Sequence, residues 1–177
     1  MKPMSVYQII ETPFSIEFCP FAYYKKDIKW YLLTILVLAI TLFVFFQSLS
    51  EGFKITIMVI LILAVFYFLK DALLKYPVKY KFDASSNTIL QSTLFRKERE
   101  IMALDEMVII PNSNNNGWHY AIGKKKQQFV KSFSISPDFG SGKKSEKKAQ
   151  LFELEILDKI RALVEQRSAT NLLKLSL

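Results

Sequence analysis

Two long runs of apolar residues dominate the pattern of hydrophobic and polar positions along the chain. Residues 30–46 read WYLLTILVLAITLFVFF and residues 55–69 read ITIMVILILAVFYFL, and neither run contains a charged side chain. An α-helix rises about 1.5 Å per residue, so roughly 20 residues cross the hydrocarbon core of a bilayer. With their flanking residues the two runs reach that length. The pattern therefore predicts a transmembrane hairpin over residues 29–75, with helices at 29–49 and 53–74.

Two other interpretations of these runs fit the sequence less well. Core helices of a soluble protein would need cover on every face, and a chain of 177 residues has little other surface to provide it. A cleaved signal peptide has a short basic start and a small-residue cleavage site, whereas here 29 mostly polar residues come before the first run. We therefore expect an integral membrane protein with two spans.

Lysine residues on either side of the runs predict the orientation of the hairpin. The connecting loop at residues 47–53 has no lysine or arginine, and its one acidic residue is Glu51. Because positive charge is retained on the cytoplasmic side, we expect both termini in the cytoplasm. The single cysteine, Cys19, agrees with a reducing compartment. The flanking lysines are Lys25, Lys26 and Lys29 before the first run, and Lys70, Lys75, Lys79 and Lys81 after the second.

Strand-like alternation follows the second run. Val78, Tyr80 and Phe82 alternate with lysines, which is typical of a half-buried strand. Residues 83–87 have turn chemistry, and residues 88–95 predict the returning strand of a hairpin. We expect a polar connection at 96–99, a loop at 112–117, and further strands at 100–104, 107–110, 118–122 and 127–136.

The segment before the first run also has strand character. Residues 6–10 and 14–18 both look like strands, and the second alternates cleanly. An isolated hairpin is marginal in water, so these segments need a partner. Both ends of the transmembrane hairpin emerge on the same face, so residues 1–28 are expected to join the domain formed by residues 76–177.

An amphipathic helix is predicted near the C-terminus, at residues 145–167. Its apolar residues recur at helical spacing and form one stripe, which we expect to be buried against the strands. The stripe consists of Phe152, Ile156, Ile160 and Leu163, with Ala149, Leu157 and Val164 beside it.

This layout resembles a known architecture. Several short strands closed by one C-terminal amphipathic helix resemble a pleckstrin-homology-like (PH-like) domain, and YKFDASSNTILQSTLFRKEREIMALDEMVIIP at residues 80–111 is similar to the opening of bacterial PH-like domains. A strand, a two-helix hairpin and then the remaining strands also resemble the YcxB-like family of small bacterial membrane proteins. The resemblance implies an α+β membrane protein in which a transmembrane hairpin is inserted in a PH-like antiparallel β-barrel or sandwich. It also implies the bacterial cytoplasmic (inner) membrane.

Residues that carry chemistry are scarce. His119, the only histidine, is expected on a sheet surface, and with one cysteine it allows no Cys/His metal cluster. In a sheet, the neighbouring residues Asp105 and Glu106 would point to opposite faces, so their carboxylates would not form a catalytic pair. The chain has no Walker-type loop, GxSxG or HExxH sequence. The apolar runs contain no ionisable group of the kind that ion pathways use. We therefore expect no enzyme activity, no cofactor and no transport by a monomer.

Basic charge is the remaining candidate for a functional feature. From Tyr76 onwards the chain has 17 Lys and Arg against 11 Asp and Glu. Near an anionic leaflet each basic residue contributes about 1 kcal/mol of attraction. The alternative is a solvated face that aids solubility and topology, and nucleic acid binding is disfavoured because the aromatic residues follow the strand alternation. The predicted lipid or partner contacts are Arg96, Lys97, Arg99, Lys124, Lys125, Lys126, Lys143 and Lys144.

Three functions remain open at this point. The first is a non-enzymatic, membrane-anchored scaffold or adaptor whose cytoplasmic PH-like domain binds a partner protein or anionic lipid. The second is an immunity protein against a membrane-active toxin. The third is an accessory subunit of a secretion or transport complex. All three are compatible with two membrane spans and with the absence of catalytic motifs.

Overall fold

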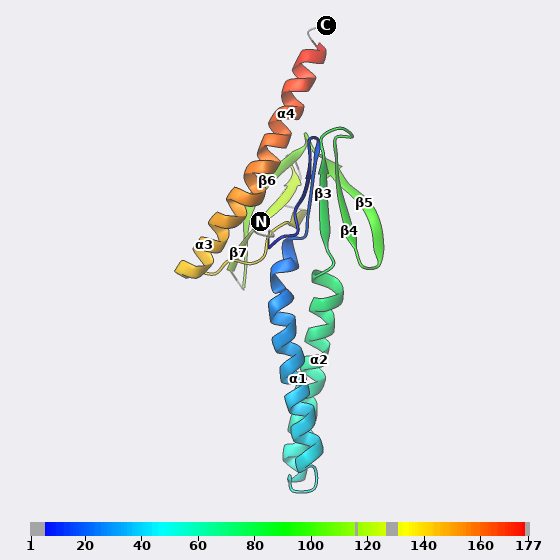
Figure 1. Ribbon diagram of the computed structural model, residues 1–177, viewed down its shortest axis with the longest axis vertical. Coiled ribbons are helices and arrows are strands. Elements are labelled where there is room, and N and C mark those ends of the chain that lie inside the picture. Colours follow the sequence, from blue (N-terminus) through cyan, green and yellow to red (C-terminus); the bar gives the residue numbers. More distant parts are fainter. Residues whose placement is uncertain (1–5, 116, 127–130, 176–177) are drawn as a thin grey trace.

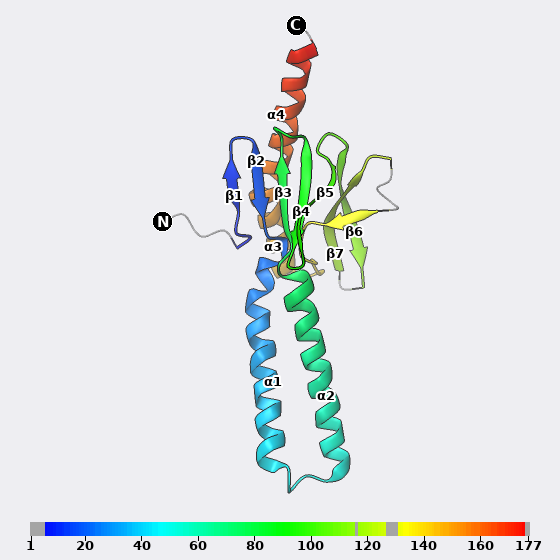
Figure 2. The same ribbon diagram turned by 90° about the vertical axis from the view of Figure 1, so that its right-hand side faces the viewer.

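The computed structural model of this chain describes residues 6–115, 117–126 and 131–175. Figures 1 and 2 show an elongated molecule in which a helical hairpin forms one end, and strands and a long C-terminal helix form the other. The hairpin consists of α1 (Lys25–Phe45) and α2 (Glu51–Lys70). A 3-10 turn at Pro20–Tyr24 leads into α1, and a π-helical turn at Asp71–Lys75 extends α2.

Two of the described helices are long and apolar enough to cross a membrane. Their apolar windows are Ile28–Phe45 and Glu51–Lys75, with mean hydropathies of 2.3 and 2.4. None of the residues in either window is buried inside the protein, so these helices are not the core of the folded domain. The first helix ends at Phe45, four residues before the predicted boundary, and residues 46–50 make the turn.

A five-stranded antiparallel sheet joins the segments on both sides of the hairpin. Its order is β1-β2-β3-β4-β5, and β2 pairs with β3 although the whole hairpin separates them in the sequence. In this pairing Ile16 lies opposite Phe82, and Phe18 lies opposite Tyr80. All four side chains are buried, so the pairing also builds the core. The strands are β1 (Ile10–Thr12), β2 (Ser15–Phe18), β3 (Lys79–Asp83), β4 (Thr88–Thr93) and β5 (Arg96–Ala103).

A second sheet contains β6 (Met107–Asn114), β7 (Gly117–Lys124) and β8 (Ser132–Ser134), in that order. Three strand predictions from the sequence are wrong. The strand expected at 6–10 is β1, which runs instead from Ile10 to Thr12. The expected connection at 96–99 is the first half of β5, and the expected loop begins too early because β6 continues to Asn114. Both stretches are exposed, so they lack the apolar alternation that would have marked them as strands. The predicted strand at 127–136 is described only from residue 131, where β8 is shorter than expected.

The expected barrel does not close among the described residues. They form two separate antiparallel sheets, in which β5 pairs with β4 and β6 pairs with β7. The first five residues of β5 are exposed. This half of β5 therefore has no apolar face to curl over a core. Asp105 and Glu106 lie in the turn between β5 and β6, which agrees with the two strands predicted on either side of them.

The C-terminal helical segment is longer than the predicted 145–167. It comprises α3 (Lys143–Phe152), a π-helical turn (Glu153–Leu157) and α4 (Asp158–Leu175). No glycine or proline occurs from residue 143 to residue 175 to end it. The predicted stripe is confirmed as buried, with Phe152, Ile156 and Ile160 fully buried. Figures 1 and 2 show α4 projecting beyond the sheets, away from α1 and α2.

Candidate functional site

The register of the first sheet fixes which strand connections lie beside the apolar helices. The chain leaves the turn after α2 and enters β3 at Lys79, which pairs with Ser92 of β4. Residues 94 and 95, which connect β4 to β5, lie just beyond this pair, at the end of the sheet where α2 joins it. We call this the helix-proximal end of the domain. Figure 1 shows the β4–β5 hairpin reaching the level where α2 begins to leave the sheet.

The β4–β5 tip, defined as residues 94–99, combines apolar and basic side chains. Leu94 is 54% exposed and Phe95 is 72% exposed, so neither contributes to the core. Three of the predicted contact residues, Arg96, Lys97 and Arg99, follow directly on β5 and are also exposed. None of these three cations forms an ion pair with a described residue.

A second basic cluster lies at the same end of the domain. Lys143 and Lys144 begin α3 and are exposed. The loop that leads into them carries Asp138, whose side chain lines a cavity together with Tyr24 and Lys75 from the ends of the apolar helices. In both ribbon views α3 begins near the level at which α1 and α2 meet the sheets.

The third predicted cluster, Lys124–Lys126, lies at the opposite end. The Nδ2 of Asn114 donates a hydrogen bond to Asp138 Oδ1 over 2.9 Å, which places the β6–β7 turn at the helix-proximal end. From there β7 runs eight residues to Lys124, roughly 23 Å at 3.3 Å per residue. There the Nζ of Lys124 lies 3.2 Å from Glu106 Oε2. The eight predicted residues therefore do not form one surface.

The prediction of a surface position for His119 is wrong. Its residue is 8% exposed, and its Nδ1 lies 3.2 Å from Asp138 Oδ1, without the geometry of a hydrogen bond. Next to His119, β7 pairs with β6 on one side, and on the other side the segment after β8 lies against it, where Trp118 pairs with Phe139 and Asp138 covers the imidazole. The sequence shows the strand, but it does not show that the strand is central.

Burial alters the acidity of three groups in the core. It raises the pKa of the Cys19 thiol, so the thiol stays protonated and is a weak nucleophile at neutral pH. Burial also raises the pKa of Tyr80 well above its usual range. Burial, assisted by the hydrogen bond that the phenol donates to Glu153, raises the pKa of Tyr120 to about 12. These groups remain neutral near pH 7 and act in packing.

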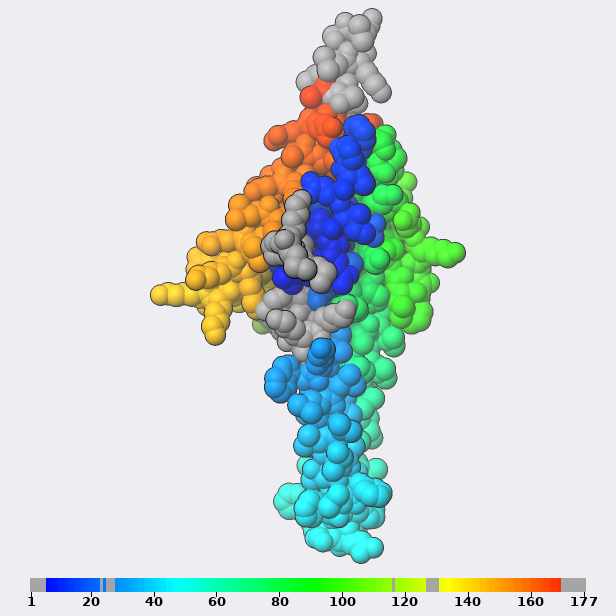
Figure 3. All heavy atoms as spheres, viewed as in Figure 1, coloured from blue at the N-terminus to red at the C-terminus, as the bar shows by residue number. Residues whose placement is uncertain are grey.

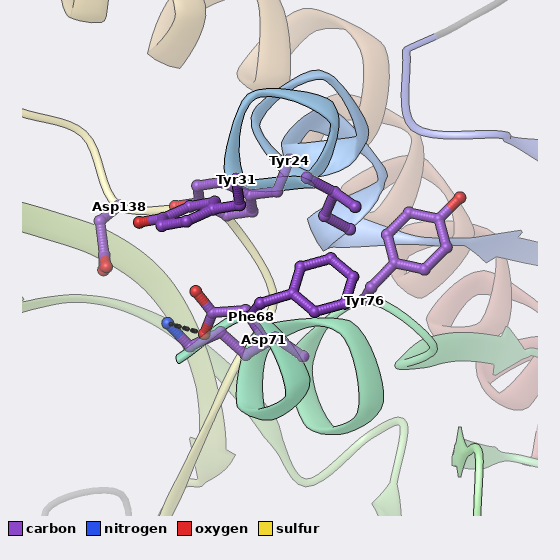
Figure 4. Close-up of a pocket in the computed structure, with 8 residues that line it drawn as sticks. Tyr24, Tyr31, Phe68, Asp71, Tyr76 and Asp138 are labelled. Carbon is purple, nitrogen blue, oxygen red and sulfur yellow. Dashed lines mark ion pairs between the residues drawn. The ribbon is translucent and has the colours of Figure 1, made fainter. Parts of the chain in front are cut away.

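The cavity at the helix-proximal end was not predicted from the sequence. Its volume is about 300 Å³, and its walls come from the start of α1, the end of α2 and the loop before α3. Figure 4 shows Tyr31 and Phe68 on opposite sides of it, with Asp138 toward one end and Tyr76 toward the other. Lys75 Nζ lies 3.4 Å from Asp71 Oδ1 at its wall. No local pattern could have identified this set, because it combines three separate segments, residues 24–31, residues 68–76 and Asp138, that together span more than 100 residues of the chain.

A metal site is the next kind of functional site to consider. Among the described residues, no group of three or more His, Cys, Asp or Glu side chains is arranged to hold a metal ion. Comparison with known protein families, with curated proteins and with solved structures finds no significant match to this chain.

Proposed function

We propose that the chain is a non-enzymatic, membrane-anchored scaffold or adaptor of the bacterial cytoplasmic membrane. In this proposal α1 and α2 cross the bilayer as a hairpin, and both termini lie in the cytoplasm. The domain built from the two sheets and the C-terminal helix is PH-like and rests on the anionic leaflet through its helix-proximal end. Its opposite end is available to a protein partner.

The order of the elements supports the PH-like part of the proposal. Strands β2 to β5 follow one another in the first sheet, β6 to β8 follow in the second, and the C-terminal helix comes last. This is the order that the resemblance to PH-like domains implies, with the hairpin inserted between β2 and β3. The ion pair between Lys159 of α4 and Glu11 of β1 ties the helix to the outermost strand.

The β4–β5 tip is the observation that carries the lipid contact. A soluble domain gains nothing by exposing Leu94 and Phe95 together, whereas an interfacial loop inserts such side chains beside the lipid headgroups. The neighbouring Arg96, Lys97 and Arg99 would then meet anionic lipid. At about 1 kcal/mol for each basic residue near the surface, the three together contribute about 3 kcal/mol.

The opposite end of the domain supports the partner-binding part. Phe14 is 56% exposed at the β1–β2 turn of this end, and Ile10 is 59% exposed midway along β1, the edge strand among the described strands of the first sheet. Figure 3 shows these N-terminal strands, in dark blue, at the surface between the C-terminal helix and the rest of the first sheet. Unpaired strand edges readily pair with another chain. The projecting end of α4 and the cluster Lys124–Lys126 lie on this side as well. A partner docking here would not compete with the bilayer.

Lipid-borne quenching tests the proposed contact with the bilayer. The full-length protein, with Cys19→Ser and a fluorophore on Leu94→Cys, is placed in nanodiscs that contain phosphatidylglycerol and headgroup-spin-labelled lipid. We expect strong quenching at position 94. A fluorophore on Phe14→Cys, which is similarly exposed but lies at the other end of the domain, should be quenched much less.

Charge removal supplies the matched comparison. Neutralising Arg96, Lys97 and Arg99 to glutamine should reduce the quenching at position 94, whereas neutralising Lys124–Lys126 removes the same charge from the far end and should leave it unchanged. Equal quenching at positions 94 and 14, or the same loss from both triple variants, would contradict the proposed orientation on the membrane.

A further inference from the structure

The cavity between the ends of the apolar helices has a composition that differs from the rest of the surface. The whole chain carries a net charge of +8, yet this cavity is lined by two aspartates, Asp71 and Asp138, and one lysine, Lys75. Aromatic rings, among them Tyr31 and Phe68, form much of the remaining wall. An acidic, aromatic cavity favours a cationic ligand group, and the lysine favours an anionic group beside it.

The arrangement of the charges separates these two preferences. Asp138 accepts a hydrogen bond from Asn114 over 2.9 Å and has the buried His119 behind it, so its position is fixed by the second sheet. Asp71 and Lys75 lie one turn apart on the π-helical extension of α2, with Nζ and Oδ1 3.4 Å apart and both side chains partly exposed. This pair is loose enough for each partner to turn towards a ligand.

The depth of the cavity along the molecule indicates the source of the ligand. Ile28 and Phe68 belong to the apolar windows of the two helices, whereas Tyr76 and Asp138 belong to the folded domain. If the helices span a bilayer, the cavity lies at the level of the lipid headgroups. A volume of about 300 Å³ is at the lower end of ligand-binding pockets, which suits a headgroup whose acyl chains stay outside against the helices.

We infer that this cavity binds the headgroup of an aminophospholipid, with the ammonium held by Asp71, Asp138 and the ring of Tyr31, and the phosphate held by Lys75. Attraction between an ammonium and an aromatic face adds to the ionic contact with the carboxylates. The inference rests on the proposed membrane anchoring. It adds a site for a zwitterionic lipid to a surface that otherwise attracts anionic lipid.

Native mass spectrometry of the full-length protein in detergent tests this inference. Phosphatidylethanolamine and phosphatidylglycerol with identical acyl chains are titrated separately, and the bound lipid is counted. We expect one phosphatidylethanolamine to be retained, with at least tenfold weaker binding in Asp71→Asn. Asp105→Asn is the control, because Asp105 is exposed in the turn at the far end of the domain. Asp138→Asn, which keeps an acceptor for Asn114, should weaken binding in the same way.

Equal retention of the two lipids, or unchanged binding in both Asp71→Asn and Asp138→Asn, would overturn the inference. Free phosphoethanolamine distinguishes the source of the ligand, because displacement of the lipid at matching concentration would assign the site to a soluble compound. The test is separable from that of the proposed function. Asp71→Asn should leave the quenching at position 94 unchanged, and neutralising Arg96, Lys97 and Arg99 should leave the retained phosphatidylethanolamine unchanged.

Discussion

Replacing Phe152 with alanine tests whether the C-terminal helix completes the core of the domain. The side chain is fully buried, and its ring lies 5.3 Å from that of Tyr7, 6.0 Å from that of Tyr120 and 6.1 Å from that of Phe139, measured between centroids. A contact with Phe18 at 6.5 Å adds the first sheet. Phe152 therefore joins the segment before α1, both sheets and the loop before α3.

The expected loss of stability follows from these contacts. Truncating a buried phenylalanine to alanine costs about 3–5 kcal/mol, because apolar burial is lost and a cavity remains. We expect about 4 kcal/mol, since the four surrounding rings are anchored in different elements and cannot all move into the cavity. This is a large share of the 5–15 kcal/mol that typically stabilises a domain.

Urea unfolding of the full-length protein in detergent measures this loss. In a Trp30→Phe background Trp118 is the only tryptophan left, and its ring lies 5.0 Å from that of Phe139, so its fluorescence reports on the same core. With a urea slope of about 1–3 kcal/mol/M, a loss of about 4 kcal/mol lowers the midpoint by roughly 1–4 M.

Leu154→Ala is the matched control on the same helical segment. Leu154 is 68% exposed, so its truncation should change the free energy of unfolding by no more than about 0.5 kcal/mol. If Phe152→Ala and Leu154→Ala shift the midpoint by the same amount, the helix does not complete the core, and the reasoning from its buried stripe is refuted.

Two further predictions concern the backbone and the topology. Gly117→Ala should destabilise the domain by about 1–3 kcal/mol in the same assay, because Gly117 has a φ of +136° and an added Cβ would lie 2.3 Å from Phe139 O. Gly140→Ala, where the added Cβ meets no atom within 4 Å, is its control and should be close to neutral. Reporter fusions to each terminus should both be active in the cytoplasm, and an external C-terminus would contradict the orientation inferred from the lysines.

Local patterns were sufficient for the helices. The apolar runs are long and uncharged, and any helix of that kind is apolar all round, so its existence follows without reference to the rest of the chain. The stripe of Phe152, Ile156 and Ile160 is similarly local, because spacing at about 3.6 residues puts these side chains on one face. Strand periodicity also located β3, β4 and β7. It missed the first half of β5, which is held by its ladder to β4 while its side chains are exposed.

The candidate sites depended on tertiary structure to a greater extent. The sequence indicated the basic residues, but only strand direction decided that Arg96 lies at the helix-proximal end and Lys124 at the other. The same strand directions place the exposed Leu94 and Phe95 beside the apolar helices.

The pairing of β2 with β3, the burial of His119 and the cavity around Asp71 and Asp138 were decided by the tertiary structure alone. Sequence periodicity tells which face of an element is apolar, but it carries no information about which distant element covers that face. That choice is made by the sum of many weak contacts across the whole chain, and it becomes visible only when all of them are satisfied together.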